Sequence, residues 1–117
     1  MSNHNTISPI PRPEILNGYT QKFNIGCGNL YVTINKDEHN NILEIIIKPG
    51  KDGGCQSNVE ALARMASLAL RAGVKIDAII DQLVGIRCLS CIRRDGVKVL
   101  SCSDAVGRAL KSINSEK

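Results

Sequence analysis

The five cysteines are the residues of this 117-residue sequence whose types and spacing could do chemistry. Three of them, Cys88, Cys91 and Cys102, lie close together in the stretch GIRCLSCIRRDGVKVLSC. Thiolates bind zinc and iron–sulfur clusters, usually four to a site. The two-residue gap between Cys88 and Cys91 lets both sulfurs reach one metal. Spacing alone therefore predicts these three as ligands, with Cys27 or Cys55 as the fourth.

The positions of the cysteines along the chain also favour a metal site. Cys27 lies between glycines, Cys55 precedes an expected helix, Cys88 follows one, and Cys102 precedes another. Loops at such junctions can turn several sulfurs toward a common point. Two other interpretations stay open at this stage, namely buried thiols that serve only as small apolar side chains, and redox-active thiols.

The other polar clusters give weaker signals. An anion or an acidic partner could bind the arginines beside the cysteines, although a solvated loop accounts for them as well; they are Arg87, Arg93 and Arg94. The stretch PGKDGG offers backbone N–H groups but matches no nucleotide-binding motif, so a turn is expected there. His4 and His39 lie in polar segments and are expected at the surface. No triad or carboxylate pair is recognisable, so we assign no catalytic residue.

Composition places the chain in the class of small single domains with an aliphatic core. Hydrophobic residues make up 43% of the sequence and aromatic residues only 3%. The net charge is +4, but so few aromatic side chains give nucleic-acid binding little support. There is no apolar run of about 18 residues and no signal peptide in residues 1–13, so we expect a cytoplasmic protein with reduced thiols and no membrane partner. The oligomeric state is not predicted.

Periodicity predicts an α+β fold in which strands precede helices. Residues 1–13 contain three prolines and are expected to form a flexible tail, followed by one domain over residues 14–117. TQKFNI, LYVTIN and ILEIIIK read as about three strands of an antiparallel meander, with alternate residues buried. A turn at Asn40-Asn41 suits positive φ.

Three helices are expected after the meander, covering one face of the sheet. The first, over residues 57–73, has a capping-box spacing at Ser57 and Glu60 and Gly73 as its C-terminal cap. Its predicted polar stripe is Glu60, Arg64, Ser67 and Arg71, and its predicted apolar side is Val59, Leu62, Ala66, Ala69 and Leu70. A short helix over Ile76–Leu83 should make contacts through Ala78, Ile79 and Ile80. The last helix should run from Asp104 to about Ile113, with Ala105, Val106, Ala109 and Leu110 buried.

Several separated motifs together resemble one known family, the TSCPD domain. They are RPEILNGYTQKFNIGCGNLYVTIN, GGC, SLALRAGV, QLVGIRC and VLSCSDAVGRAL, in that order from about Arg12 to Leu110. This domain occurs at the C-terminal end of adenosylcobalamin (vitamin B12)-dependent class II ribonucleotide reductases and as small free-standing proteins.

The resemblance implies a different set of ligands from the one that spacing favours. The four characteristic cysteines of the family correspond to Cys27, Cys55, Cys88 and Cys102, which leaves Cys91 as an alternative ligand or a redox thiol. The chain departs from the family pattern twice: LSC replaces a stretch that typically carries proline, and Ser103 replaces the proline of the name motif. Ser103 could instead cap the helix that begins at Asp104.

The function that the resemblance implies is that of an accessory domain in deoxyribonucleotide synthesis. We expect zinc at the four cysteines, with iron or an iron–sulfur cluster as alternatives, and adenosylcobalamin only through a partner subunit. That partner would be the class II reductase catalytic chain, or a nucleotide or nucleic acid; activity as a ribonucleoside-diphosphate reductase is not expected from the isolated chain. The alternatives are a dithiol relay through Cys88 and Cys91 that re-reduces a reductase active site, and a free-standing zinc-binding regulatory or nucleic-acid-binding module.

Overall fold

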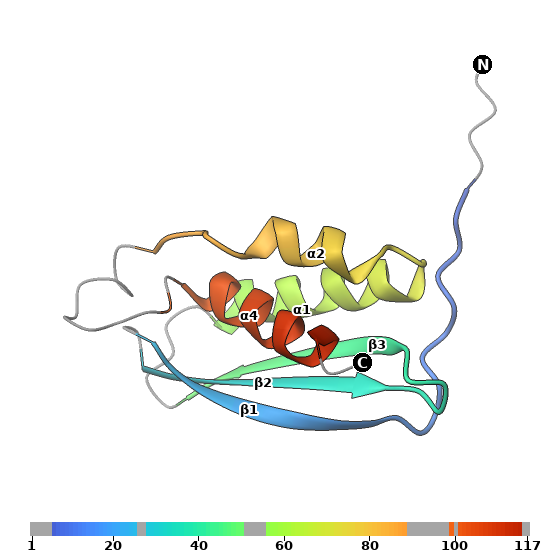
Figure 1. Cartoon of the computed structure of the whole chain (residues 1–117), viewed down its shortest axis with the longest axis horizontal. Helices are drawn as coiled ribbons and strands as arrows, with labels where there is room; N and C mark the ends of the chain where they lie inside the picture. Colours follow the sequence, from blue (N-terminus) through green and yellow to red (C-terminus); the bar gives the residue numbers. More distant parts are fainter. Residues whose placement is uncertain (1–5, 26–27, 51–55, 89–98, 100, 116–117) are drawn as a thin grey trace, which may run out of the picture.

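The computed structural model describes residues 6–25, 28–50, 56–88, 99 and 101–115. It confirms the α+β class: three strands are followed by helices along the chain (Figure 1). The strands are β1 (Asn17–Ile25), β2 (Gly28–Lys36) and β3 (Ile42–Pro49), and the helices are α1 (Gln56–Arg71), α2 (Ile76–Leu83) and α4 (Cys102–Ser115).

The three strands form one antiparallel sheet in the order β1-β2-β3, as the meander pattern predicts. Period-two alternation holds along β2, where Leu30, Val32 and Ile34 are buried. The intervening residues of β2 point to the opposite face of the sheet. The turn between β2 and β3 places Asn40 at φ 68°, in agreement with the prediction for this asparagine.

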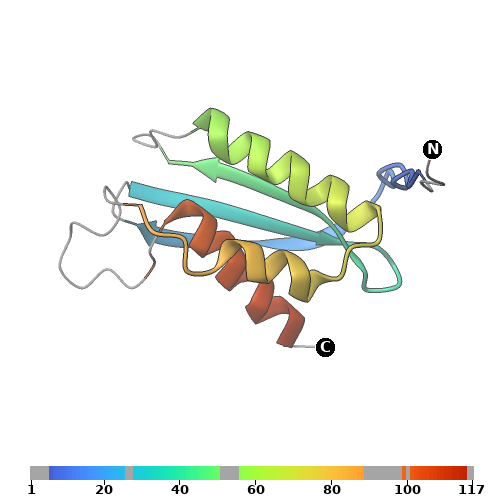
Figure 2. The ribbon, with the colours of Figure 1, turned by 90° about the horizontal axis from the view of Figure 1, so that it is seen from above.

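The helices cover one face of the sheet and leave the other open (Figures 1 and 2). Helix α1 runs back along β3, whereas α4 crosses the sheet and carries α2 on its far side. The core between these layers is aliphatic, as composition predicts. Helix α4 supplies its most buried part, with Ala105, Val106, Ala109 and Leu110 at 0–1% exposure.

Helix α1 ends at a glycine cap. Gly73 adopts φ +96°, its N–H donates to the carbonyl of Leu70, and the N–H of Val74 donates to that of Ala69. These two bonds form a Schellman motif, which confirms Gly73 as the cap. The predicted N-terminal cap is wrong: α1 already includes Gln56, so Ser57 lies inside the helix rather than before it. Glu60 instead pairs with Arg64 one turn later, at 2.8 Å.

The predicted polar stripe of α1 is wrong at Ser67, which is only 6% exposed. Its hydroxyl accepts a bond from the N–H of Ile45 (2.9 Å) and donates one to the carbonyl of the same residue (3.2 Å). One turn later, Arg71 donates to the carbonyl of Leu43 at 3.4 Å. Strand β3 is an edge of the sheet, so these side chains satisfy backbone groups that would otherwise lie unpaired.

Helices α2 and α4 approach each other closely at Gly107. A Cβ at this position would lie 2.8 Å from Val84 Cγ1 and 3.1 Å from Leu83 Cβ, so any larger residue requires its neighbours to shift. Helix α2 has the predicted bounds, but its buried residues are Ile79, Ile80 and Leu83. The prediction that Ala78 is a contact residue is wrong, because Ala78 is exposed.

Two residues of the N-terminal segment contact the domain. The N–H of Ile10 donates to the carbonyl of Arg71 at 3.0 Å. Arg12 forms a two-point ion pair with Glu44, with its Nε 2.7 Å and its second guanidinium nitrogen 3.1 Å from the carboxylate oxygens. A flexible tail over residues 1–13 and a domain over 14–117 stay predictions.

Candidate functional site

The described neighbours of the four family cysteines all lie at one end of the molecule. This end holds the close of the β1–β2 hairpin, the start of α1, the segment after α2, and the start of α4 (Figures 1 and 2). Gly28 and Gln56 directly follow Cys27 and Cys55 in the chain, while Cys88 and Cys102 themselves belong to the described residues. Segments far apart in sequence therefore meet at this end, which we call the cysteine end.

Contacts within the sheet and α1 fix one half of the cysteine end. Ile25 pairs with Gly28 where the hairpin closes, and the N–H of Gly50 donates to the carbonyl of Asn29 at 2.7 Å. Pro49 and Gln56 line one shared groove, so the end of β3 lies next to the start of α1. The end of β3 and the start of α1 therefore lie side by side at the cysteine end.

Asp104 holds together the other half, which carries Cys88 and Cys102. Its Oδ1 accepts the N–H of Gly85 at 2.8 Å, and its Oδ2 accepts from Arg108 Nε at 2.7 Å. Asp104 is only 2% exposed. The bond to Gly85 joins the segment GIRC to the segment SCSD, which are two of the motifs that resemble the TSCPD family. Gly85 adopts φ +86°, which turns the chain after α2 toward this carboxylate.

Ser101 starts the helix that carries Asp104. Its hydroxyl accepts the N–H of Asp104 at 3.0 Å, and its carbonyl accepts the N–H of Ala105. Ser101 is therefore the N-terminal cap of α4. The predicted cap, Ser103, is wrong, because α4 begins at Cys102 and Ser103 already lies in its first turn. The signal that could have found the cap was the serine three residues before Asp104.

Cys88 and Cys102 are both partly buried and pack against the core. Two further residues pack against the same core: Val99, which lies close to Cys102 in the chain, and Phe23, which belongs to β1. Position at the edge of an apolar core suits a closed structural site, because such a site excludes water from the sulfurs. It equally suits a thiol that only fills space, so burial does not by itself choose between these roles.

The structure describes some of the other predicted site residues, while the rest lie outside its described part. Arg87 is exposed beside Cys88, and His39 is exposed with its Nε2 3.4 Å from Glu38, which confirms the surface position of this histidine. Among the residues described, no three His, Cys, Asp or Glu side chains are grouped to hold a metal. Predictions for the following residues lie outside the described ones: His4, Cys27, Cys55, Cys91, Arg93, Arg94 and the KDGG part of the glycine stretch.

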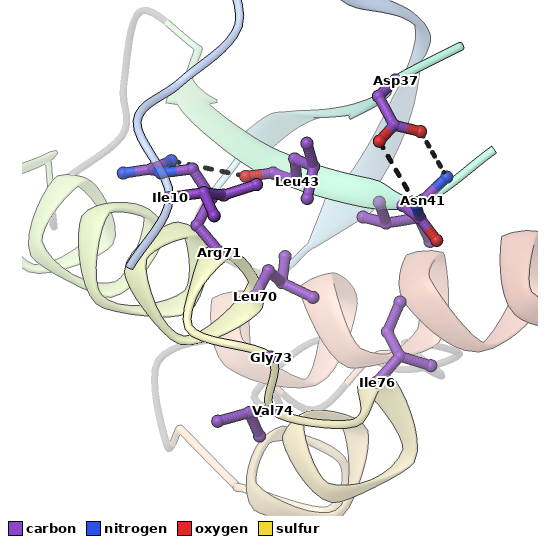
Figure 3. A pocket seen from close by; sticks show the side chains of 10 residues that line it. Ile10, Asp37, Asn41, Leu43, Leu70, Arg71, Gly73, Val74 and Ile76 are labelled. Carbon is purple, nitrogen blue, oxygen red and sulfur yellow. Dashed lines mark hydrogen bonds between the residues drawn. The ribbon is translucent and has the colours of Figure 1, made fainter. Parts of the chain in front are cut away.

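A groove of about 350 Å³ lies at the opposite end of the molecule, between Ile10, Leu70, Val74 and the β2–β3 turn (Figure 3). The side chains of Asp37, Asn41 and Arg71 in this groove already form hydrogen bonds within the protein. Asp37 accepts the backbone N–H (2.8 Å) and the side-chain amide (3.2 Å) of Asn41, and the backbone bond is the main cause that lowers the pKa of Asp37. Arg71 is directed to the carbonyl of Leu43. Nothing in the groove has the arrangement of an acid–base pair.

The chain matches the model of one protein family. A family model described as the TSCPD domain matches residues 4–114, so the chain belongs to the TSCPD domain family. This family is associated with B12-dependent ribonucleotide reductases. Searches of curated proteins and of solved structures gave no match. Within the described part of the chain, no helix is long and apolar enough to cross a membrane.

Proposed function

We propose that this chain is an accessory domain of a B12-dependent ribonucleotide reductase system, held together at its cysteine end by a metal bound to Cys27, Cys55, Cys88 and Cys102. Membership of the TSCPD family supports the link to the reductase. The single structural observation that carries the metal proposal is that Cys88, Cys102 and the described neighbours of Cys27 and Cys55 lie at one end of the molecule (Figure 1).

The chemistry of the donor set fits zinc. Four thiolates suit a tetrahedral structural zinc site, while iron or an iron–sulfur cluster would use the same ligand type. Zinc bound there would supply a cross-link between the sheet and the helices, with no open position for a substrate. Cys88 and Cys102 would enter the site from segments already joined by the bond between Asp104 and Gly85.

The size and the surface of these 117 residues support an accessory role. A reductase needs a large barrel for cobalamin, nucleotide and a radical-forming cysteine, and 117 residues do not hold one. The groove beside the β2–β3 turn (Figure 3) has no acid–base pair among its lining residues. The domain would therefore act by binding the catalytic chain, and the exposed Arg87 beside Cys88 would meet an acidic surface of that partner.

The dithiol relay through Cys88 and Cys91 is less favoured. A relay thiol has to reach a partner's disulfide, whereas Cys88 packs against the core. Reactivity at this pair would show as a reversible disulfide between Cys88 and Cys91 in the metal-free protein, which the mass of thiol-alkylated peptides detects.

The accessory role is tested with a class II reductase from which its own TSCPD domain has been deleted. Adding this chain should restore nucleotide reduction, and the two proteins should elute together in size-exclusion chromatography. The Arg87→Glu variant should weaken both effects, and Lys75→Glu, which changes an exposed charge on another part of the chain, is the control. A truncated reductase that neither binds the chain nor responds to it would contradict the accessory role.

A further inference from the structure

The open face of the sheet carries a row of three side chains that the accessory role does not use. Lys22 on β1 lies directly opposite Tyr31 on β2, and Tyr31 lies directly opposite Lys48 on β3. Residues that pair across antiparallel strands share a face, and these alternate with the buried Leu30 and Val32. All three are therefore on the face that the helices leave uncovered (Figure 1).

The row combines an exposed aromatic ring with two positive charges. Tyr31 is 37% exposed, and both lysines are exposed. Neither lysine forms a salt bridge, within the part of the chain that the structure describes. Neighbouring strands are about 4.8 Å apart, so the two lysine backbones stand roughly 10 Å from each other with the tyrosine between them.

The next row extends the surface without opposing its charge. Thr20 and Thr33 face each other with their hydroxyl oxygens 2.6 Å apart, and Ile46, 37% exposed, completes this row. Glu44 is the carboxylate that the described strands place on this face; it lies in the row beyond and is neutralised by Arg12. The centre of the face thus presents a positive, partly apolar surface.

We propose that the open sheet face binds single-stranded nucleic acid, with a base stacked on Tyr31 and phosphates contacting Lys22 and Lys48. Charge complementarity and the flat aromatic face together favour this occupant, because every base has a π-face and every linkage carries a negative charge. The bases of a duplex are already stacked, and therefore a duplex cannot use Tyr31 in this way. The proposal goes beyond the accessory role and does not depend on it.

Binding is measured by fluorescence anisotropy with the full chain and a labelled oligo(dT) of about 12 nucleotides, within the size range of single-strand sites. Tyr31→Thr should weaken binding about tenfold through lost stacking, while Tyr31→Phe keeps the ring and should bind as the parent does. Threonine is a good strand former, so the sheet should persist, which circular dichroism checks. Tyr19→Thr is the control, because Tyr19 pairs with Ile34 and therefore points to the other face of the sheet.

The lysines give an independent readout through salt dependence. Each phosphate neutralised contributes about 0.7 to the slope of log affinity against log salt for single strands, so Lys22→Gln and Lys48→Gln should each lower that slope by about this amount. Lys75→Gln removes an exposed charge from the residue before α2 and should leave the slope unchanged. Because both lysines are exposed, the salt slopes of their variants test the proposal even if Tyr31→Thr fails to fold.

Three results would overturn the proposal. The first is equal binding of oligo(dT) by the parent and by Tyr31→Thr or the two lysine variants. The second is a duplex of the same length that binds as tightly as the single strand. The third is thymidine monophosphate that competes as well as the oligonucleotide, because a strand that bridges both lysines must exceed one nucleotide.

Discussion

The buried carboxylate of Asp104 accepts the backbone N–H of Gly85 at 2.8 Å, and this bond ties the segment after α2 to the first turn of α4. Gly85 lies three residues before Cys88 and Asp104 two residues after Cys102, and we propose that both cysteines bind the metal. The bond therefore holds the segments of Cys88 and Cys102 together without involving either sulfur. Arg108, half exposed, neutralises the carboxylate from the solvent side at 2.7 Å.

Replacing Asp104 by alanine should destabilise the domain strongly. The change leaves the N–H of Gly85 without its acceptor and removes the ion pair with Arg108, for a loss of about 2–3 kcal/mol in the free energy of unfolding. Urea denaturation measures this loss. Glu60→Ala removes one partner of an exposed ion pair on α1 and should cost less than about 0.5 kcal/mol. Equal costs for the two variants would contradict the structural role of Asp104.

Ser67→Ala should also destabilise the domain, because both hydrogen bonds to the backbone of Ile45 disappear from a buried place. Two unpaired groups on an edge strand cost about 1–3 kcal/mol in total. Hydrogen exchange should show faster exchange of the Ile45 amide in this variant. The matched control is Ser57→Ala, which changes an exposed serine of the same helix. If both alanine variants unfold at the same urea concentration, the account of the β3 edge is wrong.

Gly107→Ala should lower stability although alanine is the better helix former. The added methyl group would lie 2.8 Å from Val84, so α2 and α4 must move apart, at a cost of about 1–3 kcal/mol. Thermal unfolding measures the effect. Ser112→Ala, on the exposed side of the same helix, gains helix propensity without a clash and should be neutral or stabilising. A stabilised Gly107→Ala variant would disprove the close approach of the two helices.

Acid should weaken the attachment of the N-terminal segment. The hydrogen bond from Arg12 is the largest cause that lowers the pKa of Glu44, and a bond from the Asn35 amide at 2.7 Å adds to it. A lowered folded-state pKa means that the stabilisation is complete above the unfolded value near 4.5 and is lost as pH falls through the folded value. Arg12→Gln should therefore flatten the fall in unfolding free energy below about pH 5, measured by urea denaturation across pH.

The control for the acid experiment is Arg64→Gln, which removes an arginine but keeps both Arg12 and Glu44. Because Glu44 is partly exposed, the change is expected to be a fraction of 1 kcal/mol. An acid dependence that is the same in Arg12→Gln and in the parent would show that this ion pair does not couple to folding.

Local patterns in the sequence predict the elements well. Alternation along β2 and β3 identifies the buried face of the sheet, and Gly73 marks the end of α1, because both signals depend on neighbours in the chain. The bounds of α2 agree with the prediction for the same reason.

The roles of Ser67 and Asp104 could not be predicted in this way. A helical period places Ser67 among polar residues, and only the position of α1 beside the edge of β3 gives its hydroxyl two backbone partners. Asp104 looks like an ordinary first-turn acid, yet its partner, Gly85, lies in another segment of the chain. The cysteine set shows the same limit: spacing along the chain favours Cys91, whereas the family resemblance selects cysteines from four separate segments.

The central claim, a metal site at the cysteine end, is tested most directly by the metal content of anaerobically purified chain, measured by mass spectrometry. We predict about one zinc per chain, lost when any of the four family cysteines is replaced by serine and retained in Cys91→Ser. Metal-free protein, or a metal that persists in the four variants and disappears with Cys91→Ser, would contradict the account. Metal-free protein with a reversible disulfide between Cys88 and Cys91 would establish the dithiol relay in its place.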